Sequence, residues 1–230
     1  MGAAPGDARR GPRRGRRLSG SGPVIASHAH RFVFIKTRKT AGTSLEIALS
    51  RHCGPDDIVT RISPADEELR AAAGGAGPQN DETSPSSYAH MGARRVIEVI
   101  GRQAWDDYFT FAVERNPFDV VASSYRYSAR KPTFTKTFAE FVRTPRRMER
   151  LALNERLYRV AGQVVVDRVY RYEELPDAVA DISARLGVDL DLPHAKQGSG
   201  PHYRELYGPG DAEIVAQRFR RTIREFGYEF

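Results

Sequence analysis

The sequence predicts an α/β fold, a single domain whose parallel sheet is flanked by helices. Two short apolar runs, residues 32–36 and 109–113, each lead through a loop into a segment with helical character. A third strand-like stretch at 163–172 is also followed by a helical pattern. Strands that alternate with helices pack as a parallel sheet covered on both faces. The 230 residues suffice for one sizeable core and are too few for two comfortable domains.

The first half of the chain predicts one strand and three helices. Residues 32–36 form a continuous apolar run typical of a buried strand, and residues 43–52 follow as a helix with Thr43 or Gly42 near its N-cap. A short helix over 64–73 is opened by a proline at its first position. The remaining segments of this half are a Gly/Pro/Ser-rich loop at 74–87 and a helix at 92–101.

The second half contains the clearest helix, over 117–129, with Pro117 in its first turn and Asn116 as its cap. Asp119, three residues after that cap, resembles the second member of a capping box and suits the positive helix end. The other predicted elements are a strand at 109–113, helices at 137–143 and 150–161, a strand at 163–172, a helix at 173–186 and a helix at 211–225.

Positive charge is concentrated at the start of the chain. The formal net charge is +7, but residues 1–20 hold six arginines against one aspartate and so carry +5, which leaves +2 for the rest. The Gly-, Pro- and Arg-rich composition of this first segment predicts a disordered basic tail over 1–27, followed by a folded domain over 28–230. Such a tail can touch nucleic acid or an acidic membrane surface, although a solvated terminus without a specific partner is the simpler interpretation.

The remaining totals indicate a cytoplasmic protein. There is no apolar signal-peptide core and no transmembrane run of about 18 apolar residues. The single cysteine, Cys53, excludes an internal disulfide and a CxxC metal site.

The stretch 37–44, "TRKTAGTS", has the composition of a phosphate-holding loop. It lies between a strand and a helix start, where free N–H groups and the helix dipole attract an anion. Lys39 offers a point charge and Gly42 allows close backbone approach. The candidate binding residues are Arg38, Lys39, Thr40, Ala41, Gly42, Thr43 and Ser44. The Gly-Lys pair of the usual nucleoside-triphosphatase loop is missing, which disfavours an ATPase. On this stretch alone, a basic loop that merely caps a helix is equally plausible.

A second anion site is predicted at the end of the 109–113 strand. Arg115 follows the strand and Ser123 lies eight residues later, on the second turn of the next helix. Ligands of open α/β sheets bind at the carboxyl ends of strands. Two such cradles suit a nucleotide with phosphates at both ends.

The two loops together resemble those of sulfotransferases that use 3′-phosphoadenosine 5′-phosphosulfate (PAPS). "KTRKTAGTSLE" is similar to the loop that grips the 5′-phosphosulfate in that family, and "RNPFDVVASSY" to the one that grips the 3′-phosphate through an Arg and a Ser. The resemblance continues through "HMGARRVIEVIGRQAWDDYFTFAVERNP", "VYRYEEL", "LGVDLDLPHAKQG" and "FGYEF", covers about residues 30–230, and is closest to the carbohydrate-type branch with bacterial members. Arg38 departs from the family by replacing a proline, and Glu114 by replacing an apolar residue. On a strand, Glu114 should point away from Arg115.

The resemblance implies the P-loop-like sulfotransferase fold and a set of roles. Lys39 would stabilise the leaving phosphate and His90 would be the catalytic base, while Lys196 would reach a phosphate of the nucleotide. A helix-capping or surface role for His90 and a solvated Lys196 are the alternatives. The donor would be PAPS and the product adenosine 3′,5′-bisphosphate (PAP), with no metal required.

The expected reaction is sulfuryl transfer to a hydroxyl of a small-molecule natural product or a carbohydrate. The competing functions are a P-loop nucleotide or small-molecule kinase and, less favoured, a basic nucleic-acid-binding module. No specific nucleic-acid partner is expected, because the charge is confined to the tail. The basic segment 126–147 is compatible with an acidic acceptor, although a solvated helix face is the safer interpretation.

Overall fold

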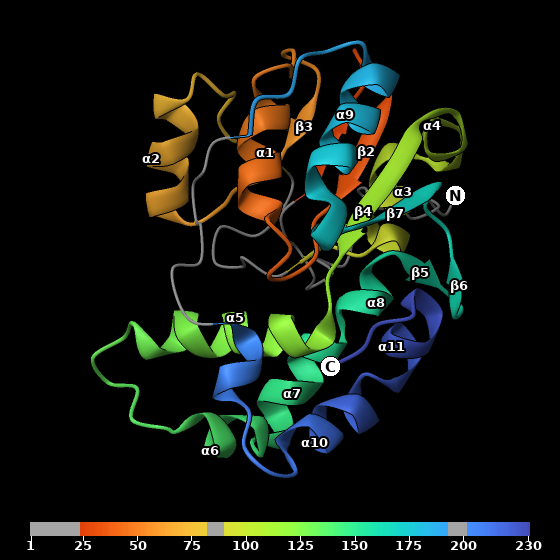
Figure 1. Ribbon diagram of the computed structural model, residues 1–230. Helices are drawn as coiled ribbons and strands as arrows, with labels where there is room; N and C mark the ends of the chain where they lie inside the picture. Colours follow the sequence, from red (N-terminus) through yellow and green to blue (C-terminus); the bar gives the residue numbers. More distant parts are fainter. Residues whose placement is uncertain (1–23, 82–89, 193–201) are drawn as a thin grey trace, which may run out of the picture.

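The computed structural model describes residues 24–81, 90–192 and 202–230, and its centre is a five-stranded sheet (Figure 1). The strand order is β3-β1-β2-β4-β7. The bounds are Val24–Ser27 for β1, Phe32–Ile35 for β2, Ile58–Val59 for β3, Phe109–Glu114 for β4 and Arg168–Arg171 for β7.

The sheet is mixed, with a parallel centre and an antiparallel edge. Strands β2, β4 and β7 are parallel, whereas β1 pairs antiparallel with both β2 and β3. The prediction of a parallel sheet therefore holds for the three strands that precede the main helices. The first strand was missed: Val24–Ser27 is fully in register with β2, and all four of its residues are buried. The folded domain thus begins before the expected boundary at residue 28.

Alternation along β2 supplies the cores on both faces of the sheet. Phe32 and Phe34 belong to one buried cluster, with α1 (Gly42–Ser50) and α9 (Leu175–Leu186). Val33 and Ile35 point into the opposite cluster, beneath α3 (Ala93–Ile100) and α4 (Arg102–Asp107). Successive side chains of a strand face opposite sides, so a fully apolar run indicates a strand covered on both faces. Helices on both sides of the sheet were expected, and the structure confirms them (Figure 1).

A third cluster joins helices that lie below the sheet in Figure 1. It is built around α5 (Pro117–Ala129), which packs against α6 (Phe138–Val142), α7 (Pro145–Ala152) and α10 (Asp211–Arg218). The last predicted helix breaks at Phe219, and the chain resumes as α11 (Arg220–Phe226). The short elements that remain are α2 (Pro64–Ala72), α8 (Asn154–Leu157), η1 (Tyr172–Glu174) and η2 (Tyr203–Leu206).

The helix predicted over 150–161 and the strand over 163–172 are wrong in part. Residues 159–164 form a hairpin of β5 (Arg159–Val160) and β6 (Gln163–Val164). Its two-residue turn, Ala161 and Gly162, has positive φ at both positions, 50° and 83°. Such turns match the twist of paired strands and stop both neighbouring elements.

Among the described residues, no helix combines the length and apolar character that crossing a membrane requires.

Candidate functional site

The two predicted anion loops meet at one edge of the sheet. β2 and β4 are parallel neighbours, so the loop after Ile35 and the residue after Glu114 emerge side by side. The guanidinium Nη1 of Arg115 donates a hydrogen bond of 2.9 Å to the carbonyl oxygen of Lys39. The structure therefore joins the two motifs into one site, although 75 residues separate them in the chain.

The loop enters α1 through an unusual backbone. Lys39 and Ala41 have φ of 66° and 58°, in the left-handed region that costs a non-glycine residue of order 1 kcal/mol or more. Ala41 is the N-cap, not Thr43 or Gly42 as expected, and it provides no side-chain acceptor. The first N–H groups of α1 are thus left without a side-chain cap, the arrangement that suits an anion at a helix N-terminus.

Lys36, which the sequence motif does not include, fills the space in front of Gly42. A Cβ on Gly42 would lie 2.6 Å from Cγ of Lys36, so glycine is required for the lysine stem to cross the helix start. The ammonium of Lys36 forms an ion pair with fully buried Glu46 and donates to Thr43 Oγ1 at 3.3 Å. The pKa of Glu46 is raised above its usual value, because burial outweighs the opposing effect of the neighbouring Lys36 cation. Gly42 therefore allows a close approach of the Lys36 side chain, whereas the loop motif predicts a close approach of a ligand there.

Hydroxyls fasten this loop to the sheet. Thr37 Oγ1 donates to the Val113 carbonyl and lies 2.7 Å from Thr40 Oγ1. Thr40 is fully buried, so its side chain holds the loop and only its backbone is placed to meet a ligand. Thr43 and Ser44 are half-buried in the first turn of α1.

Arg115 is held in place by contacts on both sides of its guanidinium. Asp119 accepts from Nε at 3.0 Å and from Nη2 at 2.5 Å, and the Tyr172 ring lies 3.9 Å from the guanidinium carbon. The expected cap is confirmed, because the Asn116 side chain accepts from the Phe118 N–H. The capping-box interpretation of Asp119 is wrong, since its carboxylate binds Arg115 instead.

Ser123 lies on the side of α5 that faces the loop. Asp119, Ser123 and Tyr127 are four residues apart, so they share one face of the helix. Asp119 contacts Arg115, and the Tyr127 ring lies 4.6 Å from Nζ of Lys39. Ser123, half-buried, is therefore positioned between the two contacts that join α5 to the site.

Glu114 faces away from the Arg115 guanidinium, as its place on the strand predicts. Its carboxylate accepts from Tyr158 Oη at 2.9 Å and from the backbone N–H of Arg115 at 3.1 Å. Burial, the largest cause, raises the pKa of Glu114 to about 7, and the nearby carboxylates of Glu155 and Glu173 add to the effect.

His90 is presented with a defined tautomer. Its Nδ1 lies 2.8 Å from the Lys36 carbonyl oxygen, which can only accept, so Nδ1 carries the proton and Nε2 keeps its lone pair. Burial and the charges of Arg38, Lys36 and Arg150 lower the pKa of His90 to about 3. The imidazole is therefore neutral at pH 7, the form that accepts a proton.

Arg38 belongs to the loop through its backbone only. Its N–H donates to Asn154 Oδ1 at 3.0 Å, and Asn154 Nδ2 donates to the Arg38 carbonyl at 2.9 Å. Its side-chain charge interacts with Arg150 and His90, on the α7 side of the loop. Lys196, the remaining predicted residue, lies outside the described residues.

Sequence reasoning missed several residues that shape this site. Lys36, Asp119 and Tyr127 each contact a predicted residue, yet none stands out by type as part of the site. A usable signal was Glu46, a carboxylate on the inner face of an otherwise apolar helix, because a buried acid implies a buried partner. Three aromatic residues, Trp105, Tyr170 and Tyr172, could stack on adenine by type, although core packing is the more common use of such side chains. Trp105 and Tyr170 are indeed buried in the core clusters, whereas the Tyr172 ring lies against the Arg115 guanidinium.

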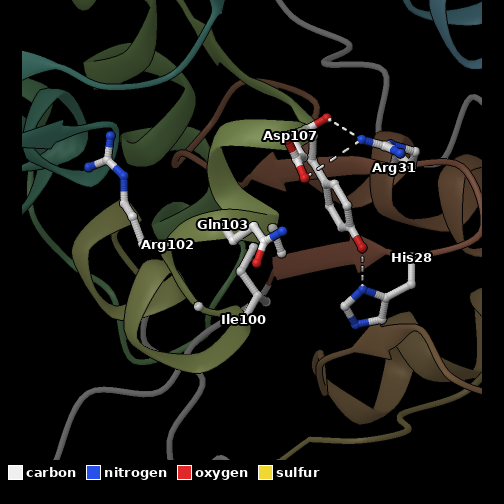
Figure 2. Close-up of a pocket in the computed structure, with 9 residues that line it drawn as sticks. His28, Arg31, Ile100, Arg102, Gln103 and Asp107 are labelled. Atoms are coloured by element: carbon white, nitrogen blue, oxygen red, sulfur yellow. Dashed lines mark hydrogen bonds and ion pairs between the residues drawn. The ribbon is translucent and has the colours of Figure 1, made fainter.

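A hollow of about 540 Å³ lies at the opposite end of β4 (Figure 2). Here Arg31 pairs with Asp107 at 3.9 Å, and His28 Nδ1 lies 2.6 Å from the Tyr108 hydroxyl. Figure 2 shows the Arg102 side chain directed away from these residues. The hollow is at the amino end of β4, whereas the two loops occupy the carboxyl end, so it is separate from the candidate site.

In the described ranges no group of three or more His, Cys, Asp or Glu is placed to hold a metal ion.

Comparison with known proteins gave one sequence relative and structural likenesses. No family model matches the chain. Mouse sulfotransferase SULT7A1, crystallised in complex with PAP, aligns over 87% of this chain and 90% of its own, at 15% identity and a TM-score of 0.48. A sulfotransferase from Alicyclobacillus acidocaldarius aligns over 86% of this chain and 98% of its own, at 20% identity and a TM-score of 0.40. Both TM-scores are below 0.5, so we draw no conclusion from either likeness.

The sequence relative is an uncharacterized protein of Archaeoglobus fulgidus. It is 30% identical over 104 residues, which make up 44% of this chain and 87% of the archaeal protein. The two chains therefore belong to one protein family.

Proposed function

We propose that the protein is a PAPS-dependent sulfotransferase that transfers a sulfuryl group to a hydroxyl of a small-molecule or carbohydrate acceptor. The observation that carries the proposal is the hydrogen bond between Arg115 and the Lys39 carbonyl. It brings two cationic loops, each at the end of a parallel strand and each followed by a helix start, to one edge of the sheet. A nucleotide with anions at its 3′ and 5′ positions needs two such cradles at a fixed separation.

The residues fit this donor chemically. The uncapped start of α1 and the Lys39 ammonium would hold the 5′ end, while Arg115 and Ser123 would hold the 3′-phosphate. When bound, PAPS would supply the sulfuryl group: the acceptor oxygen would gain the new bond to sulfur, and adenosine 3′,5′-bisphosphate would leave with the electron pair of the broken S–O bond. The ring of Tyr127, 4.6 Å from Nζ, positions the Lys39 cation near this edge.

His90 is suited to remove the acceptor proton. Its Nδ1–H is engaged by the Lys36 carbonyl, so Nε2 is the atom that receives a proton from an attacking hydroxyl. Lys39 would stabilise the negative charge that develops on the leaving phosphate. Both roles require only positioning and charge, as in phosphoryl transfer.

The first measurement is calorimetric titration with adenosine 3′,5′-bisphosphate, beside ADP and ATP with Mg²⁺. We expect the bisphosphate to bind at least about tenfold more tightly than ADP, because only it engages both cradles. Arg115→Ala should weaken bisphosphate binding by about tenfold or more, since a charge-assisted contact contributes roughly 1.5–3 kcal/mol. Arg220→Ala, an exposed arginine on α11, is the matched control. Preference for ATP with Mg²⁺ would favour a kinase and overturn the proposal.

A further inference from the structure

The side chain of Arg38 stands in a setting that an arginine rarely occupies. Its Nε and Nη1 are buried and have no hydrogen-bond partner among the described residues. Asn154, itself 3% exposed, grips the Arg38 backbone from both sides and so fixes where the guanidinium emerges. A buried donor without a partner costs about 1–3 kcal/mol, more when it is charged. A ligand that accepts from these nitrogens would remove that cost.

A second arginine, Arg150, lies near enough to Arg38 for its charge to act on the Arg38 guanidinium. Arg150, on α7, precedes Asn154 by four residues, about one helical turn. The structure records no hydrogen bond or ion pair for Arg150 within the ranges it describes, and no carboxylate pairs with Arg38 there either. After burial, the charge of Arg150 is the main cause that lowers the pKa of Arg38 to about 10. Two guanidinium groups in this arrangement repel each other until an anion is placed between them.

The arginine pair adjoins His90 and not the Arg115 end of the site. Both guanidinium charges act on the His90 ring, whose Nε2 is the proton acceptor. Arg115, by contrast, lies against Asp119 and Tyr172. The pair is therefore placed where an acceptor would lie beside its base, away from the cradle assigned to the 3′-phosphate.

We propose that Arg38 and Arg150 form a subsite for a carboxylate of the acceptor, so that the substrate is an acidic hydroxyl compound such as a uronic-acid sugar. The planar fork of arginine matches a carboxylate through two parallel hydrogen bonds. That the bound anion is a sulfuryl acceptor rests on the proposed sulfotransferase function, whereas the existence of the anion site does not. In this proposal the Arg38 side chain binds the acceptor, whereas the sequence motif predicts that it binds the nucleotide.

The subsite also explains how a weakly basic His90 would act. Arg38, Lys36 and Arg150 disfavour its protonated form. A carboxylate bound between the arginines offsets part of that positive charge and makes proton uptake at Nε2 more favourable. A neutral acceptor provides no such compensation, so the site would discriminate by activating its base only for an acidic substrate.

The test compares p-nitrophenyl β-glucuronide with p-nitrophenyl β-glucoside, which differ at the carboxylate, by calorimetry on the full chain without nucleotide. We expect the glucuronide to bind at least about tenfold more tightly. Arg38→Met and Arg150→Met should each reduce this preference by about tenfold, while Arg220→Met should leave it unchanged. Arg150 is exposed, so its variant is a safe test even if Arg38→Met fails to fold.

Three results would overturn the subsite. These are equal binding of the two glycosides, no measurable binding of the glucuronide, and a preference that survives both substitutions. A parallel titration of Arg38→Met with adenosine 3′,5′-bisphosphate separates the two proposals. A tenfold loss there, with glucuronide binding intact, would return Arg38 to the nucleotide. Failure of the wild-type protein to bind the bisphosphate would refute the proposed function while the glucuronide result still decides the anion site.

Discussion

At the scale of single residues, buried carboxylate Glu114 makes stability depend on pH. Its pKa is raised from 4.5 to about 7 in the folded chain, so between these values the folded state binds more protons than the unfolded state. Stability from this group is complete below about pH 4.5 and is lost as the pH rises through 7. The size of the loss is about 3 kcal/mol, because each pKa unit corresponds to about 1.4 kcal/mol.

The substitution Glu114→Gln removes this titration and keeps an oxygen that can accept from the Arg115 N–H. We expect the variant to match the wild type in urea unfolding at pH 4.5 and to exceed it by up to about 3 kcal/mol at pH 8. Glu213→Gln, on the exposed side of α10, makes the same change of charge without burial and serves as control. A difference that stays constant from pH 4.5 to 8 would show that Glu114 is ionised throughout.

His90 and Lys39 provide a second prediction at this scale. In an acceptor screen with PAPS, His90→Ala should lower turnover by about 10²–10⁴-fold and Lys39→Ala by about 10²–10³-fold. The His90 variant should bind adenosine 3′,5′-bisphosphate within about twofold of the wild type, because the imidazole bonds to the Lys36 carbonyl and the proposed 3′-phosphate contact is at Arg115. Near-normal turnover of His90→Ala would exclude it as the base.

At the scale of elements, the start of α1 depends on a glycine for an internal reason. A Cβ at position 42 would meet Cγ of Lys36 at 2.6 Å and push the lysine stem out of its path to Glu46. Glu46 is fully buried, so a displaced Lys36 leaves it without its cation. Removing one partner of a buried ion pair costs about 3–5 kcal/mol when nothing replaces it.

We therefore expect Gly42→Ala to destabilise the protein by about 1–3 kcal/mol through overpacking, although alanine is favoured over glycine inside helices. Gly54→Ala is the matched control, because no atom lies within 4 Å of the added Cβ. Urea unfolding of both variants measures the difference. If Gly42→Ala is as stable as Gly54→Ala, the Lys36 stem has an alternative path and glycine serves only a ligand.

At the scale of the whole molecule, the predictable parts are those that local sequence determines. The loop at 37–44, the cap at Asn116 and the α5 helix follow from short-range patterns, and the adjacency of the two loops follows from parallel strands ending at one edge. Strand β1 could not be predicted from its own residues, because its apolar run is short and lies beside a basic tail. It forms a strand because it pairs with β2. The direction of the Arg38 side chain depends on Asn154, 116 residues away, which no local pattern contains.

The tail gives the last prediction. Residues 1–20 carry a charge of +5 of the total +7, while the first strand begins only at Val24. Deleting residues 1–20 therefore removes most of the positive charge and leaves the sheet intact. We expect the shortened chain to bind adenosine 3′,5′-bisphosphate within about twofold of the full chain, because both cradles lie at the carboxyl edge of β2 and β4.

Any binding to duplex DNA should fall sharply on the same deletion, and in the full chain it should weaken steeply with salt, as expected for phosphate contacts made by arginines. A full-length variant with the six tail arginines changed to glutamine separates charge from length. If that variant or the deletion loses bisphosphate binding, the tail contributes to the nucleotide site. If DNA binding survives both changes, the folded domain itself has a nucleic-acid surface, and the interpretation of the net charge as a property of the tail is wrong.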